Sequence, residues 1–208
     1  MRDPAFAVSW HHRGMPPSLP FLLGPAELPL AELHAARLDG ELVGVGDRFS
    51  PPDIARTVDL RGARELRALA LAPRLPAGLV VERRTAAWLH GAWAAPPGPL
   101  ELCVRSDHRV RVSPDVAWTL RQAVFHPSEL VVVRGVLVTT PLRTALDLLR
   151  LPPDGLFDGR HRSAVATLLL MGPRGRAEAE AVLTRSPHLP HKQRALDRLG
   201  ALEHLVPA

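Results

Sequence analysis

Several residue types are almost absent from this sequence, and each absence narrows the classes of protein to which it can belong. Of its 208 residues only one is cysteine and none is tyrosine. A single cysteine, Cys103, forms no disulfide within the chain and builds no cysteine-rich zinc module. No apolar run approaches the ~18 to 20 residues that a membrane-spanning helix needs. The first residues also lack the continuous apolar core of a signal peptide, so we expect a cytoplasmic protein that does not contact a membrane.

Lysine is nearly missing too, because Lys192 is the only lysine among 26 basic residues and the other 25 are arginine. The chain is also rich in alanine, proline and leucine, so this bias reflects GC-rich codon usage as much as a selected basic surface. The formal net charge of +5 is therefore only a mild indication of a polyanionic partner. The hydrophobic fraction of 46% and the charged fraction of 23% are ordinary for a globular chain with a sizeable core.

Proline, glycine and the spacing of apolar residues divide the chain into regions whose predicted fold class is α+β. The regions are a proline-rich arm (1–25), a winged-helix remnant (26–53), a mixed α/β domain (54–150) and a helical C-terminal extension (151–208). In the second region, a helix is expected over about 30–38, and it precedes two strands that flank Gly46-Asp47. Its predicted apolar side consists of Leu30, Leu33, Ala36 (or Arg37) and Leu38. This order of helix, strand, turn and strand is that of the second half of a winged helix.

The third and fourth regions contain further predicted elements. Helices are expected over about 63–72 and 84–90, the second closed by Gly91, and from Thr140 as N-cap to Arg150. Strands are expected over 79–81, 100–104, 110–112, 117–124 and 130–133, the last paired with 136–139 across Arg134-Gly135. Pro51 and Pro52 are expected to end the winged-helix remnant. The tail is predicted to form three helices separated by Gly172-Pro173 and Ser186-Pro187.

Two segments of the third region are more distinctive than the rest: ERRTAAWLHGAW over 82–93 and GVLVTTPLRTALDLLR over 135–150. Their order and the strand-rich stretch between them resemble the AbiEi-type antitoxins of type IV toxin–antitoxin systems, in particular the actinobacterial branch. The resemblance covers about Leu30 to Arg150 and continues loosely through the helical tail. It implies a cytoplasmic, non-enzymatic protein whose winged helix represses its own promoter. It also implies that the C-terminal domain neutralises a nucleotidyltransferase-like toxin.

The two motifs are mostly structural in their physical chemistry. Trp88 and His90 are expected to be buried or half-buried structural residues. Arg83 and Arg84 begin a helix, where free backbone N–H groups favour an anion, so a nucleic-acid or acidic-partner contact is worth testing there. Arg143 either forms a surface ion pair with Asp147, four residues away on the same helix, or projects into a cleft and binds a partner or phosphate.

The charge of the winged-helix remnant opposes DNA binding. Residues 26–53 contain two arginines, Arg37 and Arg48, against six acidic residues. DNA affinity depends largely on neutralising phosphates, so this segment is better explained as a structural lid on the main domain. The arginines that follow are better candidates, although a solvated arginine-rich surface is the simpler explanation for them. The complete set of candidate nucleic-acid or partner-binding residues is Arg37, Arg48, Arg64, Arg67, Arg83, Arg84, Arg109, Arg111 and Arg143.

Enzymatic interpretations find little support in the sequence. A restriction-like nuclease needs an acidic residue two positions before a lysine, and Pro190 precedes Lys192 at that spacing. His188 and His191 have no close carboxylate or cysteine to complete a metal site. We therefore expect no catalytic residue, no cofactor and no metal. The preferred hypothesis is an antitoxin that neutralises a nucleotidyltransferase-like toxin, and the alternative is a DNA-binding winged-helix (auto)repressor.

Overall fold

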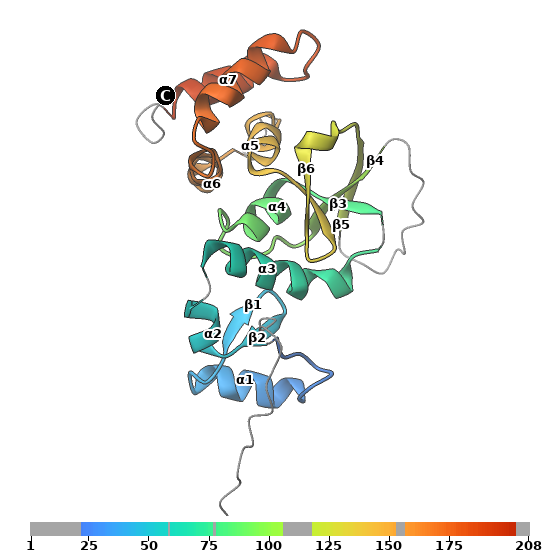
Figure 1. Cartoon of the computed structure of the whole chain (residues 1–208), viewed down its shortest axis with the longest axis vertical. Helices are drawn as coiled ribbons and strands as arrows, with labels where there is room; N and C mark the ends of the chain where they lie inside the picture. The colour runs from blue at the N-terminus through green and yellow to red at the C-terminus, as the bar shows by residue number, and fades with distance from the viewer. Residues whose placement is uncertain (1–21, 58, 77, 106–117, 153–156, 203–208) are drawn as a thin grey trace, which may run out of the picture.

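The computed structural model describes residues 22–57, 59–76, 78–105, 118–152 and 157–202 (Figure 1). Within them the chain folds as α+β, with helices arranged around a two-stranded and a five-stranded sheet. The arm up to residue 21, the predicted strand 110–112, and Arg109 and Arg111 lie outside the described residues. None of the helices in the described ranges is long and apolar enough to cross a membrane.

A small N-terminal unit contains α1 (Leu30–Leu38), β1 (Val43–Val45) and β2 (Arg48–Ser50). The two strands pair antiparallel around a tight turn, as the sequence predicted. An isolated antiparallel bridge joins Leu23 to Phe49, with N···O distances of 2.7 and 2.9 Å between their backbones. A third chain segment, at Leu23, thereby pairs with strand β2 of the hairpin.

The core of this unit is small, and it corrects one expectation. Leu33, Leu42 and Phe49 are its buried apolar residues. Leu30 is exposed and Leu38 is 88% exposed, so the predicted three-leucine apolar side of α1 is wrong. Only Leu33 and, in part, Ala36 of the helix pack into this small core.

Two helices connect this unit to the main sheet. The first, α2 (Pro52–Thr57), was not predicted from the sequence, because Pro51-Pro52 was interpreted as a terminator. Proline is nevertheless well suited to a first helical position, where its missing N–H costs nothing. The second, α3 (Leu60–Leu71), begins three residues earlier than expected because Asp59 accepts a hydrogen bond from the Gly62 N–H at 2.7 Å.

The main sheet has the strand order β5-β4-β3-β7-β6. The strands are β3 (Leu79–Val81), β4 (Leu100–Arg105), β5 (Trp118–Ala123), β6 (Leu130–Val133) and β7 (Val136–Thr139). Strand β3 lies at the centre, parallel to β7 and antiparallel to β4, while β5 is parallel to β4. The predicted β6–β7 hairpin is confirmed, with both turn residues, Arg134 and Gly135, at positive φ.

The predicted helices of the motifs and the tail are also confirmed. They are α4 (Arg83–His90), α5 (Pro141–Leu149), α6 (Gly159–Leu170), α7 (Gly175–Arg185) and α8 (Lys192–Gly200). Gly91 caps the C-terminus of helix α4 in the left-handed conformation, with a φ of 91°, which glycine adopts easily because it has no side chain. Thr140 is the N-cap of α5, and its hydroxyl accepts a hydrogen bond from the Arg143 N–H at 3.3 Å.

Two large hydrophobic cores hold the main body together. In the first, α3 and α4 pack against apolar side chains of β3, β4, β6 and β7. In the second, α5 and α6 pack with α7 and α8, and Ala87 of α4 also belongs to it. Figure 1 shows the N-terminal unit at one end of the molecule, α3 across the middle, then the sheet with α4, and α7 toward the other end. Helix α4 therefore links the sheet to the helical layer.

Candidate functional site

The two sequence motifs meet in a buried network of charged side chains. Glu82, just before α4, is only 2% exposed, and Asp147 of α5 is 3% exposed. Arg121 of β5 holds Glu82 with two parallel hydrogen bonds, Nε to Oε1 at 2.6 Å and Nη2 to Oε2 at 2.5 Å. Burial raises the pKa of the Glu82 carboxyl, and the contacts with Arg121 oppose this. The fork geometry of the pair makes it a strong internal link between β5 and α4.

Asp147 is shared by three arginines. Its Oδ2 accepts from Arg143 Nε at 3.0 Å and lies 3.5 Å from Arg121 Nη2, while its Oδ1 accepts from Arg150. The predicted pairing of Arg143 with Asp147 is therefore confirmed, but its placement on the surface is wrong. The sequence could not show this, because β5 supplies the third arginine from 26 positions away along the chain.

Arg143 has internal partners on every side. Besides Asp147 it donates to Glu129 Oε2 at 2.6 Å, and its guanidinium lies 4.7 Å from the centre of the Phe125 ring. The alternative in which Arg143 projects into a cleft toward an external ligand is thus not favoured, since its charge is already neutralised and stacked.

The predicted anion at the start of α4 is a carboxylate of the protein itself. Glu101 of β4 accepts from the Arg84 backbone N–H at 2.7 Å and from Arg84 Nη2 at 2.9 Å. Arg83 adopts a positive φ of 47°, and its Nε is buried without a hydrogen-bond partner, 3.9 Å from Glu82 Oε1. Arg84 is therefore occupied within the fold, and Arg83 lies beside the buried Glu82.

Trp88, His90 and Cys103 are buried structural residues, as predicted. His90 Nε2 lies 2.7 Å from the Thr139 carbonyl oxygen, to which it donates. Burial lowers the pKa of His90 to about 4, so its ring is neutral at physiological pH. Burial likewise raises the pKa of the Cys103 thiol, which makes it unreactive.

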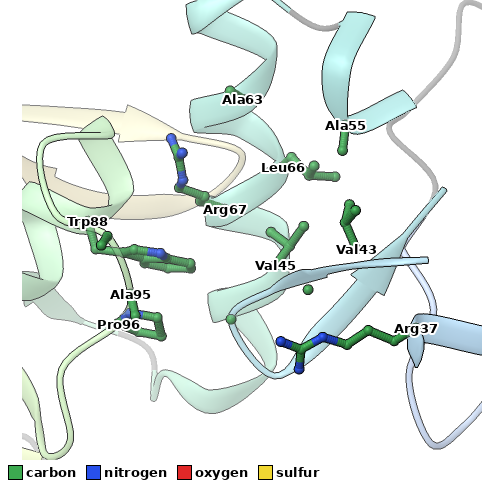
Figure 2. Close-up of a pocket in the computed structure, with 13 residues that line it drawn as sticks. Arg37, Val43, Val45, Ala55, Ala63, Leu66, Arg67, Trp88, Ala95 and Pro96 are labelled. Carbon is green, nitrogen blue, oxygen red and sulfur yellow. The ribbon is translucent and has the colours of Figure 1, made fainter. Parts of the chain in front are cut away.

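A pocket of about 380 Å³ lies where the N-terminal unit meets α3 and α4 (Figure 2). Its walls include the apolar side chains of Val43, Val45 and Leu66, with Trp88 on the opposite side. Its only charged lining residues among those the structure describes are Arg37 and Arg67. Figure 2 shows that the two guanidinium groups point in different directions, so they do not form one binding site there.

Arg67 instead points toward the end of α4, where a second and larger cleft of about 680 Å³ opens. This cleft, which we call the α3 cleft, brings together Arg61, Arg64 and Arg67 of α3. In the described part of the chain, Arg64 and Arg67 have no acidic partner. The α3 cleft is therefore lined by two arginines whose positive charge no acidic side chain of the described residues neutralises.

The predicted arginines thus fall into separate groups. Arg64 and Arg67 line the α3 cleft. Arg37 and Arg67 both line the pocket between the N-terminal unit and helices α3 and α4. Arg48 pairs with Glu27 at 3.4 Å inside the N-terminal unit, and Arg84 and Arg143 belong to the buried network. Sequence reasoning missed Arg121, Arg150 and Arg61. The signal for the first two was the presence of Glu82 and Asp147 within apolar segments, since buried carboxylates require paired cations.

Metal ligands are not grouped in the described ranges, where no three His, Cys, Asp or Glu side chains converge. In a comparison with known families, a family model described as the AbiEi antitoxin C-terminal domain matches residues 76–187, more than half of the chain. No curated protein matches the sequence. The matched range runs from just before β3 to the end of α7 and contains the whole buried network.

Proposed function

Since the chain belongs to the AbiEi antitoxin family and is thus an antitoxin of a toxin–antitoxin system, we propose that it neutralises a nucleotidyltransferase-like toxin without catalysing a reaction itself. The family match supports the first half of this statement. The nucleotidyltransferase-like nature of the toxin is what the resemblance to this family implies, and the absence of turnover is inferred from the residues within the matched range.

The observation that carries the proposal is the state of the buried carboxylates. Glu82, Glu101 and Asp147 are the only acidic residues buried in the described part of the matched range, and arginines of the same chain hold all three. A carboxylate that acts as a general base or metal ligand needs a free oxygen facing a substrate cavity. These oxygens instead fasten β5, α4 and α5 together. These buried ion pairs therefore support the interpretation of the domain as a rigid scaffold that binds the toxin through its surface.

Co-expression with the product of a neighbouring nucleotidyltransferase-like gene tests the proposal. The wild-type chain should restore growth that the toxin arrests. If wild-type protein present at a normal soluble level fails to restore growth with any adjacent gene product, the proposal is wrong.

An isosteric variant separates a scaffold from a catalyst. Glu101→Gln keeps the shape of the side chain and removes its charge, so it weakens the contact with Arg84. We expect the variant to restore growth in proportion to its soluble, folded level, measured by circular dichroism and immunoblotting. A folded variant at wild-type level that no longer restores growth would point to chemistry at Glu101.

A second candidate function, binding to promoter DNA, is favoured by the placement of α1. The helix buries only Leu33 and lies at the end of the molecule, with His34 and Arg37 exposed (Figure 1). If this helix contacts DNA, the upstream region of the gene should be retarded in a gel, with affinity that falls steeply as salt rises. Arg37→Ala should abolish the shift. Retention of the shift in that variant would exclude α1 as the reader.

A further inference from the structure

The α3 cleft is assembled from helices that are distant in sequence. Helix α3 forms one wall, and the last residues of α4, the start of α5 at Pro141 and the end of α6 form the rest. Its volume of about 680 Å³ lies within the range of roughly 300 to 1,000 Å³ that is typical of small-molecule sites. A concave space of this size suits a compact ligand better than the broad, flatter area of a protein–protein interface.

The charge inside the cleft has one sign. Arg61, Arg64 and Arg67 follow one another at three-residue intervals, so they lie along one side of α3 over about 9 Å of helix length. Among the described residues no Asp or Glu lines the cleft. The one nearby carboxylate, Glu65, contacts Arg61 at 3.4 Å, but Arg61 is 79% exposed and that contact is weak.

Two of these arginines carry the cost of burial without a counter-charge. Burial lowers the pKa of the half-buried Arg67 guanidinium, and the Nε of Arg64 is buried without a hydrogen-bond acceptor. Like charges at this spacing on a helix repel one another. A bound anion would therefore both pair these groups and relieve their repulsion.

The end of α4 keeps the arginines accessible. Gly91 has no side chain, and a Cβ atom at that position would come within 3.1 Å of Arg67 Nη1. The neighbouring His90 donates its Nε2 hydrogen to the Thr139 carbonyl and stays neutral, so it adds no charge to the cleft. The positive charge of α3 thus remains unneutralised from this side as well.

Apolar side chains form the other part of the cleft. Leu60 is 90% exposed, and Leu170 and Met171 at the end of α6 are exposed as well. Large apolar residues beside cationic ones fit a ligand that has a charged end and an apolar or aromatic body. No Phe, Trp or Tyr lines the described cleft, so it lacks the stacking platform typical of proteins that bind single-stranded nucleic acid.

We propose that the α3 cleft binds an organic phosphate, with contiguous phosphate groups on Arg61, Arg64 and Arg67 and the apolar or aromatic body against Leu60, Leu170 and Met171. Arginine recognises phosphate through two parallel N–H···O bonds, and three arginines in a row match a ligand that carries several phosphates. Nucleoside triphosphates are the plainest examples of this chemistry. The inference goes beyond the proposed antitoxin function and does not depend on a toxin.

Isothermal titration of the full chain at constant ionic strength tests the proposal. The probes are ATP, inorganic triphosphate, inorganic phosphate, a short single-stranded oligonucleotide and a peptide rich in glutamate. We expect ATP and triphosphate to bind, inorganic phosphate to bind roughly tenfold more weakly because it contacts fewer arginines, and ATP to bind more tightly than triphosphate. Tighter binding of the oligonucleotide than of ATP would show that the cleft does bind phosphate groups, but that these belong to a single-stranded nucleic acid. Binding of the peptide alone, or of no probe at millimolar concentration, overturns the proposal.

Variants locate the binding in the cleft. Arg67→Gln should weaken ATP binding about tenfold or more, as expected for the loss of a charge-assisted pair. The unliganded variant should melt no lower than the wild type, because a repelling charge has been removed. Arg61→Gln, at an exposed position that cannot disturb the core, should weaken ATP by a smaller factor.

Arg160→Gln provides the matched control, because it removes one exposed charge near the other end of α6, about 15 Å along that helix from Leu170. Its affinity for ATP should stay within about twofold of the wild type, the change expected from net charge alone. Equal losses of affinity in Arg160→Gln and Arg67→Gln would show non-specific attraction and would overturn the proposal.

Discussion

His90 gives the folded chain a specific pH dependence. Its Nε2 lies 2.7 Å from the Thr139 oxygen, and burial lowers its pKa to about 4. In the unfolded chain a histidine has a pKa of about 6.5. As the pH falls below that value, the ring is protonated in the unfolded state but stays neutral in the folded state. The contribution of His90 to the free energy of unfolding is therefore complete above pH 6.5 and declines as the pH falls toward 4, by at most about 3 kcal/mol.

Urea unfolding of the wild type and of His90→Gln between pH 7 and pH 4 measures this contribution. Glutamine keeps an N–H donor near the Thr139 carbonyl but does not titrate. The difference in unfolding free energy between the two proteins should shrink as the pH falls, because only the wild type loses stability through this group. A difference that stays constant over the whole range would show that His90 is not the buried, neutral ring described here.

For single residues, the sequence predicts whether a side chain is buried better than it predicts which side chain it contacts. Trp88, His90 and Cys103 lie among apolar neighbours, and that is enough to predict that they are structural. The partner of Glu82 is different, since Arg121 is 39 positions away and reaches it only because β5 pairs with β4. Pairings of this kind depend on strand order, which composition and periodicity do not determine.

The turn between α6 and α7 depends on the absence of a side chain at one position. A Cβ atom on Gly175 would lie 2.0 Å from the Leu169 carbonyl oxygen, a backbone atom that cannot move away cheaply. Gly175→Ala should therefore force α7 away from α6 and lower the free energy of unfolding by ~1–3 kcal/mol, the usual range for overpacking. Thermal and urea unfolding both report this change.

Gly172 supplies the matched control within the same turn. A Cβ atom there would find its nearest neighbours at 3.9 Å, an ordinary contact distance. Gly172→Ala should change the free energy of unfolding by only ~0.5 kcal/mol or less. Equal effects of the two substitutions would indicate that loss of backbone freedom, and not the close approach to Leu169, controls this turn.

Elements bounded by strong local signals were predictable, and those that depend on the surrounding fold were not. The Thr140 cap and the Arg134-Gly135 turn gave correct bounds for α5 and for the β6–β7 hairpin. Helix α2 was missed because a proline pair is ambiguous between the end of one element and the start of another. The exposed Leu38 shows the same limit, since helical periodicity identifies an apolar side but not whether anything covers it.

Across the whole molecule, the α3 cleft was beyond sequence reasoning. Arg64 and Arg67 were among the predicted binding residues because of local charge alone. Their separation from the paired Arg84 and Arg143 depends on where the carboxylates lie in the fold. The cleft exists only because the ends of α4 and α6 and the start of α5 converge beside α3.

The N-terminal unit should behave as a separate cooperative unit. Among the residues that the structure describes, its core has three buried apolar side chains, Leu33, Leu42 and Phe49, whereas the cores of the sheet and of the helical layer are much larger. Phe49→Ala removes the largest side chain of the small core, and such a substitution typically costs about 3–5 kcal/mol. So small a unit has little stability to spare, so we expect it to open while the rest of the molecule stays folded.

Hydrogen–deuterium exchange followed by mass spectrometry resolves the two parts. In Phe49→Ala, peptides from residues 30–50 should lose protection, and peptides from β7 and α5 should keep it. Leu38→Ala is the control, because Leu38 lies in the same unit but is exposed, so its removal leaves the small core intact. If Phe49→Ala instead removes protection from β7 and α5 as well, the N-terminal unit and the sheet unfold as one cooperative unit. The close approach of Gly46 to the Trp88 ring, which a Cβ atom at Gly46 would reach at 3.3 Å, would then be the contact that couples them.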